Sequence, residues 1–177
     1  MPRIRPHALP IRIAGLVAAG LAVAGCSSGG PEAKREYAVP ASLCGVALPA
    51  STLEPLLPAG KKISSVKSGP SGFTRCRLVV DGRIAVTSII EQRAPETTLS
   101  GVAYSTYGMS DTVEREGKYV ISDAQAVGHA SCDKPQKADH ETFTMVRADA
   151  ENVGKATMEK VISKFTDAVS ASKRCAG

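Results

Sequence analysis

The chain has 177 residues, of which 43% are hydrophobic and 22% are charged. This balance is typical of one globular domain with extensions, and it excludes a protein that crosses a membrane many times. The formal net charge is +5, but Arg3, Arg5 and Arg12 precede Cys26, and no Asp or Glu lies among the first 25 residues. The rest of the chain therefore carries only +2, and we expect no nucleic-acid partner, because such a protein needs a clustered basic face.

Residues 1–25 have the parts of an export signal, in which arginines precede an uncharged stretch from Ile13 to Ala24. As a helix this stretch would be under about 20 Å long, so it favours a cleaved signal over a permanent anchor in a ~30 Å hydrocarbon core. Arg3 and Arg5 are not adjacent, which favours the general secretory route over the twin-arginine route.

The uncharged stretch ends in Val23-Ala24-Gly25-Cys26. These residues resemble the lipobox of bacterial lipoproteins. The resemblance implies a diacylglyceryl group on the Cys26 sulfur, cleavage between Gly25 and Cys26, and an N-acyl chain such as palmitate. Two acyl chains hold a protein stably, so we expect a lipid-anchored protein on the outer face of the cell membrane. The alternative is ordinary cleavage nearby, with Cys26 left as a thiol.

The residues after Cys26 show no apolar periodicity up to Glu36, and their composition is that of a flexible tether. We therefore divide the chain into a signal peptide (1–25), a lipidated cysteine with its tether (26–40) and one α+β domain (41–177).

Four further cysteines lie in the predicted domain. They are Cys44, Cys76, Cys132 and Cys175. An even number of cysteines in an exported domain predicts two disulfides, with three possible pairings. We favour Cys44–Cys76 with Cys132–Cys175, because each bond would join a helix end to a neighbouring strand. His129 precedes Cys132 closely enough to suggest half of a metal site, but we expect the disulfide and no metal.

The first half of the domain contains a short helix at 51–57, capped by Ser51 or Thr52, and a turn-rich segment at 61–72. Two apolar strands, 76–80 and 84–90, flank the turn residues Asp81-Gly82 and predict a hairpin. We favour a three-residue connection with a bulge over a two-residue loop, because it would place six residues on one face. They are Cys76, Leu78, Val80, Ile84, Val86 and Ile90.

The second half contains an ambiguous segment at 96–109, a helical turn followed by a loop, and further strands at 118–121, 124–127 and 142–146. A final helix begins at a cap, Asn152 or Asp149, and carries an apolar stripe. The stripe is Val153, Met158, Val161, Ile162, Phe165, Ala168 and Val169. The sum predicts an α+β fold, a mostly antiparallel sheet of about five strands with helices on one side and a long C-terminal helix.

No catalytic motif is complete in this chain. Gly69-Pro70-Ser71-Gly72-Phe73 lacks the second glycine of a nucleophile elbow. Ser64–Lys67 and Ser170–Lys173 match S-x-x-K without the partner motifs of penicillin-binding proteins. We expect no enzyme activity, no catalytic or metal-binding residue, and no cofactor beyond the lipid on Cys26.

Seven basic residues lie within one third of the chain. If several share a surface, they would favour anionic lipid headgroups or wall polymers, whereas the alternative is an ordinary solvated face. They are Lys61, Lys62, Lys67, Arg75, Arg77, Arg83 and Arg93.

Three short segments add to the lipobox: Leu43-Cys44-Gly45, Leu57-Pro58-Ala59-Gly60 and Arg75-Cys76-Arg77. With them, the chain resembles small actinobacterial cell-envelope lipoproteins of unknown function, a resemblance that implies no active-site residues. We expect a non-catalytic binding or sensor-like module, whose partner is an envelope protein, a lipid or a wall polymer. The alternative is a structural or interaction protein of envelope assembly without a small-molecule ligand.

Overall fold

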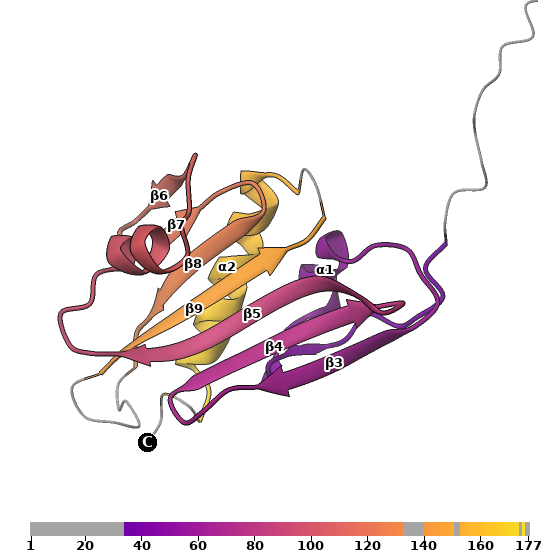
Figure 1. Ribbon diagram of the computed structural model, residues 1–177, viewed down its shortest axis with the longest axis horizontal. Coiled ribbons are helices and arrows are strands. Elements are labelled where there is room, and N and C mark those ends of the chain that lie inside the picture. The colour runs from indigo at the N-terminus through magenta and orange to yellow at the C-terminus, as the bar shows by residue number, and fades with distance from the viewer. Residues whose placement is uncertain (1–33, 133–139, 151–152, 174, 176–177) are drawn as a thin grey trace, which may run out of the picture. The chain divides into compact units, whose positions relative to one another are not determined.

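A computed structural model describes residues 34–132, 140–150, 153–173 and 175; the predicted signal, Cys26 and Asn152 lie outside these ranges. One antiparallel sheet dominates the fold, with the strand order β3-β4-β5-β9-β8-β7-β6 (Figure 1). Its strands are β3 (Ile63–Ser68), β4 (Phe73–Val80), β5 (Arg83–Arg93), β6 (Val113–Arg115), β7 (Tyr119–Ile121), β8 (Gln125–Ala130) and β9 (Glu141–Ala148).

The predicted α+β class, the antiparallel sheet and the C-terminal helix are confirmed, but the sheet has seven strands rather than about five. The strands that the sequence did not indicate, β3 and β6, lie at the two edges. Five of the six residues of β3 are exposed. A strand with both faces exposed does not require alternating apolar residues. The residue pattern of such a strand therefore resembles that of a loop.

One face of the sheet is covered by helix α2 (Lys155–Ser170) and by an N-terminal layer. This layer comprises the short strands β1 (Ser42–Leu43) and β2 (Val46–Ala47), helix α1 (Ala50–Leu53) and a 3-10 turn, η1 (Glu54–Leu56). The predicted stripe of α2 packs here, with Met158, Val161, Ile162, Phe165 and Val169 all buried.

The opposite face is covered in part by the segment that the sequence left ambiguous. It forms η2 (Gly101–Thr106), one turn of π-helix, which lies in front of the sheet in Figure 1. A second core separates it from the sheet: Ile89, Val102, Ala103, Met109, Val120, Val127, Phe143 and Met145. The prediction that helices cover only one side was therefore wrong.

The β4–β5 hairpin has a two-residue turn, which corrects the predicted three-residue connection. Val80 pairs with Arg83, and both Asp81 (φ 49°) and Gly82 (φ 83°) adopt the left-handed conformation that this tight turn requires. A register shift after Leu78 then places Leu78 opposite Val86, so the apolar face survives. The exception is Ile84, which the sequence placed in the core and which is 39% exposed.

Neither predicted helix cap is present in the described residues. Pro49 precedes α1, so the first helix begins without a Ser or Thr side-chain cap. Gly154 precedes α2, and the Lys155 amide donates to the Asp123 carboxylate at 3.2 Å. Asp123 lies in the turn between β7 and β8. A distant side chain therefore satisfies an amide at the start of α2, a contact that local sequence cannot reveal.

Candidate functional site

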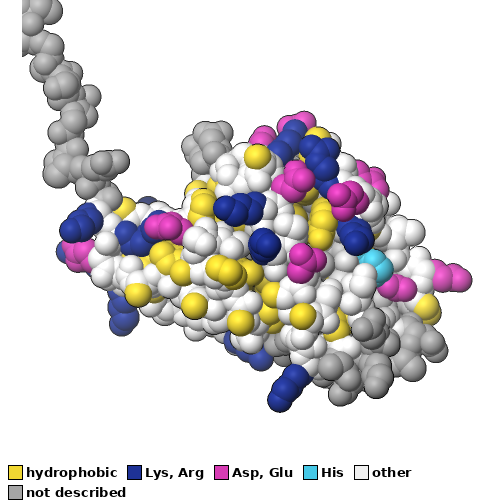
Figure 2. All heavy atoms as spheres, turned by 180° about the vertical axis from the view of Figure 1, so that it is seen from behind, with side chains coloured by type: hydrophobic (Ala, Val, Ile, Leu, Met, Phe, Trp, Pro, Cys, Tyr) yellow, Lys and Arg dark blue, Asp and Glu magenta, His cyan; other side chains and the backbone are white. Residues whose placement is uncertain are grey.

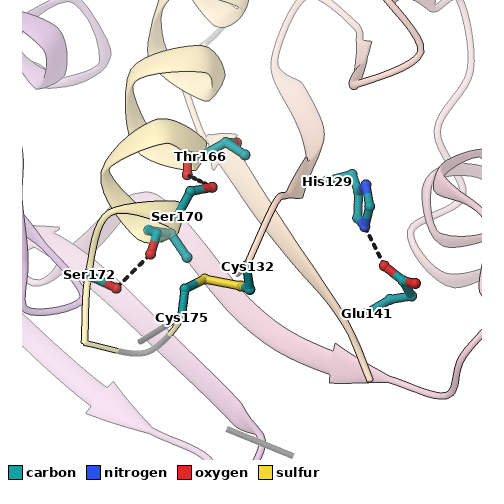
Figure 3. The surroundings of a disulfide bond; sticks show 8 residues. His129, Cys132, Glu141, Thr166, Ser170, Ser172 and Cys175 are labelled. Atoms are coloured by element: carbon teal, nitrogen blue, oxygen red, sulfur yellow. Dashed lines mark hydrogen bonds and ion pairs between the residues drawn. A yellow bond between two sulfur atoms is a disulfide. The ribbon is translucent and has the colours of Figure 1, made fainter. Parts of the chain in front are cut away.

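Two disulfides join the elements of the domain in the pairing that the sequence favoured. Cys44, in the turn between β1 and β2, bonds to Cys76 in β4, with Cα atoms 5.4 Å apart. Cys132, just after β8, bonds to Cys175 beyond the end of α2, with Cα atoms 4.6 Å apart (Figure 3). Only the second joins a helix end to a strand, whereas the first joins a turn to a strand.

Residues 35–39, which the sequence placed in the tether, contact the domain in the structure. The Arg35 guanidinium donates to Glu54 Oε1 at 3.0 Å and to the Leu57 carbonyl at 2.6 Å. The Glu36 amide donates to the Gly60 carbonyl at 2.8 Å. The first contacts of the domain with its N-terminal segment therefore lie at η1 and in the segment between η1 and β3.

A buried carboxylate lies at one end of the second core. Glu91 in β5 is 3% exposed, and both of its oxygens have partners: Tyr107 donates to Oε1 at 2.7 Å and Arg93 to Oε2 at 2.7 Å. Burial, and then the hydrogen bond to the Glu91 carboxylate, raise the pKa of Tyr107. The carboxylate thus ties the π-helical segment to the sheet.

A second acid–base pair lies two strands away. His129 Nε2 in β8 lies 2.5 Å from Glu141 Oε2 in β9, and the imidazole packs against the Phe143 ring at a centroid distance of 5.1 Å (Figure 3). Glu141 is also the register partner of Arg93 in β5. Among the described residues, no group of three or more His, Cys, Asp or Glu side chains is placed to hold a metal.

Sequence reasoning did not single out Glu91 or Tyr107. The available signal was the position of Glu91, two residues after Ile89 in a predicted apolar strand. Residues two apart in a strand share a face, so a charge there must be buried and paired. Its partner Tyr107 came from the segment of uncertain structure.

The two S-x-x-K segments lie apart in the structure. Ser64–Lys67 is part of edge strand β3, whereas Ser170–Lys173 spans the C-terminal end of α2. Ser170 donates to the Thr166 carbonyl at 3.1 Å and Ser172 to the Val169 carbonyl at 2.6 Å, as Figure 3 shows. These hydroxyls satisfy carbonyls in the last turns of the helix, an ordinary structural role.

The seven basic residues of the central third do not share one surface, because Lys67 pairs in register with Cys76 and so lies on the other face of the sheet from Arg75 and Arg77. Arg93 is paired with Glu91, and the backbone amides of Lys61 and Lys62 each donate to the Asp81 carboxylate at 2.9 Å. These backbone hydrogen bonds lower the pKa of Asp81. On the side turned away from the viewer of Figure 1, which Figure 2 shows, several Lys and Arg side chains lie among Asp and Glu side chains.

Arg75 and Arg77, by contrast, share one face of β4, because they are two residues apart in a regular part of the strand. Register extends this face to a third arginine. Thr87 in β5 pairs with Arg77 on one side and with Arg147 of β9 on the other. We call the surface formed by Arg75, Arg77, Thr87 and Arg147 the arginine face.

The described residues line several open clefts, two of which are as follows. One, of about 550 Å³, lies at the β4–β5 turn between Pro58, Arg83, Ile84 and Asp149. The other, of about 350 Å³, lies between the β6–β7 hairpin and α2, and its lining includes Arg115 and Glu159, whose side chains are 3.3 Å apart. The described helices include none long and apolar enough to span a membrane.

Replacing Tyr107 by phenylalanine is expected to lower the free energy of unfolding at pH 8 by about 1–3 kcal/mol, because the buried Glu91 carboxylate loses a donor. The pKa of Tyr107 in the folded protein is raised, so its stabilising effect is complete only well below about pH 10, the usual pKa of an unfolded tyrosine, and is lost progressively as the pH rises toward and above that value. The difference between wild type and variant should therefore shrink from pH 9 to pH 11 in urea unfolding. A constant difference, or equal shrinkage in a Tyr104→Phe control, would contradict this.

The fold and its two disulfides define this protein as an α+β domain whose sheet carries a helical layer on one face and a π-helical segment on the other. A scan against family models and searches of curated proteins and of solved structures found no match to the chain.

Proposed function

We propose that the protein is a lipoprotein anchored by its lipid on the outer face of the cell membrane. We propose further that its folded domain is a non-catalytic binding module of the cell envelope. The observation that carries the proposal is the pair of disulfides, Cys44–Cys76 and Cys132–Cys175. Disulfides persist in oxidising compartments outside the cytoplasm, which is where the export signal and the lipobox ending at Cys26 would direct the chain.

The surface of the domain supports binding rather than catalysis. The buried acid, Glu91, has a hydrogen-bonding partner on each oxygen, and the His129 ring of the His129–Glu141 pair lies against the Phe143 ring. The arginine face, by contrast, places three arginines on one side of the sheet, next to the second core. These features suit recognition of a partner without chemistry on it.

A structural role in envelope assembly is the second candidate, and edge strand β3 favours it. Val66 in this strand is 49% exposed, and the strand has a neighbour on one side only. Such an edge can pair with a strand of another protein. Lys67 in the same strand is a charge of the kind that discourages that pairing.

Replacing Cys26 by alanine tests the anchor. We expect the variant to keep its signal segment and to incorporate no radioactive palmitate. The reason is that the sulfur that would accept the diacylglyceryl group is gone. Wild type should label and should fractionate with membranes after the cells are broken. A Ser28→Ala variant, altered two residues away, is the matched control and should behave as wild type. Normal processing and membrane retention of Cys26→Ala would overturn the proposal.

A further inference from the structure

The arginine face lies on the side of the sheet that carries η2, but beside η2 rather than beneath it. Arg75 pairs in register with Ile89, which belongs to the second core covered by η2. Arg77 lies two residues further along β4, beyond that core, and its partner Thr87 is 6% exposed between the two flanking arginines. The face thus begins where the cover of η2 ends.

The charge of this face is largely uncompensated. Within the described parts of the chain, Arg75 and Arg77 form no ion pair with a carboxylate. Arg147 Nε lies 3.6 Å from Asp149, and both of these side chains are substantially exposed. Arg75 lies over the Phe73 ring at 5.3 Å, a contact that orients the guanidinium and leaves its charge available.

The spacing of these cations is regular because the sheet sets it. Side chains two residues apart on a strand are about 7 Å apart, which is the expected separation of Arg75 and Arg77. Arg77 and Arg147 lie two strands apart, or roughly 10 Å. A guanidinium presents a planar fork of N–H donors that matches the oxygens of a phosphate.

We propose that the arginine face binds a linear polymer with phosphate groups in its backbone, lying along β4 beside η2. Successive phosphates of such a polymer can lie against Arg75 and Arg77, whose planar N–H forks match phosphate oxygens. This inference rests on the proposed envelope location, and it names the ligand class of the binding module.

The shape of this surface favours a chain over a flat membrane. The η2 segment packs on the same side of the sheet and stands about one helix diameter, roughly 10 Å, above it. Tyr104 on η2 is 44% exposed. A planar bilayer would meet η2 before it reached Arg75 and Arg77, but a single polymer chain can lie in the step between them.

The test is titration of the full-length protein as purified from its host, in a neutral detergent, with long-chain inorganic polyphosphate. We expect binding that weakens as salt is added, because bound counterions are released from the polymer. The double variant Arg75→Gln/Arg77→Gln should bind at least about tenfold more weakly. The slope of its log affinity against log salt concentration should fall by the contribution of about two charges. Lys160→Gln/Lys164→Gln removes equal charge from the exposed face of α2 and should stay within about twofold of wild type.

Three results would overturn the proposal: no binding of polyphosphate to wild type, equal loss in both double variants, or stronger binding to polyglutamate of equal charge. A fourth result would also overturn it: the protein binds vesicles that contain anionic phospholipid but not polyphosphate, and the vesicle binding is lost when Arg75 and Arg77 are replaced. That result would assign the arginine face to the membrane. The variant Arg75→Lys/Arg77→Lys keeps the charge and controls for misfolding; it should bind more tightly than the glutamine variant. None of these results depends on Cys26 labelling, so a failed ligand assignment is distinguishable from a failed anchor.

Discussion

Replacing Cys44 and Cys76 together by alanine is expected to lower the free energy of unfolding by about 3–5 kcal/mol. The bond spans 32 residues of sequence, and the chain-entropy model assigns such a loop about 3.7 kcal/mol. Both cysteines are also nearly buried in the main core, at 5% and 1% exposure, so their truncation leaves a cavity as well. Urea unfolding of the purified protein measures the change.

The Cys132→Ala/Cys175→Ala variant is the matched comparison. Its bond spans 43 residues, so the entropic contribution is similar, but Cys132 is only partly buried at the edge of the core. We therefore expect the Cys44/Cys76 variant to be the less stable of the two. An unchanged urea midpoint for that variant would show that the bond contributes nothing to the folded domain.

Replacing Gly128 by alanine is expected to cost about 2–3 kcal/mol, because the added methyl group has no room. A Cβ atom at this position would lie 2.3 Å from Thr166 Oγ1 of α2 and 3.0 Å from Thr144 Oγ1 of β9. These two hydroxyls are themselves hydrogen-bonded at 2.7 Å, in the interface between α2 and the sheet. The methyl group must therefore displace the helix or break that bond.

A double variant separates this clash from a general loss of stability. Thr166→Ala removes the nearest atom, so Gly128→Ala/Thr166→Ala should be more stable than the sum of the two single changes predicts. Thermal or urea unfolding of the four proteins closes the cycle. Strict additivity, or a Gly128→Ala protein as stable as wild type, would show that the helix is not in close contact with β8 at this point.

The elements that sequence reasoning predicted bury at least one face, and β5 and β9 bury both over most of their length. The stripe from Met158 to Val169 predicted α2, and the alternating apolar residues around Asp81-Gly82 predicted the hairpin. The turn itself was mispredicted because a register shift after Leu78 restores the apolar face that a two-residue loop alone would lose. Periodicity locates strands, but it does not reveal where a bulge absorbs one residue.

The remaining features depend on contacts between distant segments. The arginine face needs Arg147, which the sequence did not group with Arg75 and Arg77 and which only the order β4-β5-β9 brings close. Glu91 has its role only because η2 folds over it. Edge strand β3 has no burial signal at all. The apolar pattern of one segment cannot reveal which distant residue will lie beside it in the folded chain.

The Cys44–Cys76 bond also determines how the domain responds to a pull on its N-terminal end. Tension applied ahead of Lys34 first reaches the hydrogen bonds of Arg35 and Glu36, and these can open one at a time. It then reaches Cys44 and passes through the covalent sulfur bridge into β4, near the middle of the hydrogen-bonded sheet order β3-β4-β5. The 31 residues from Gly45 to Arg75, enclosed by the bridge, are shielded from that load. A domain pulled from this end would therefore lengthen by the ten residues 34–43 before the sheet itself carried the force.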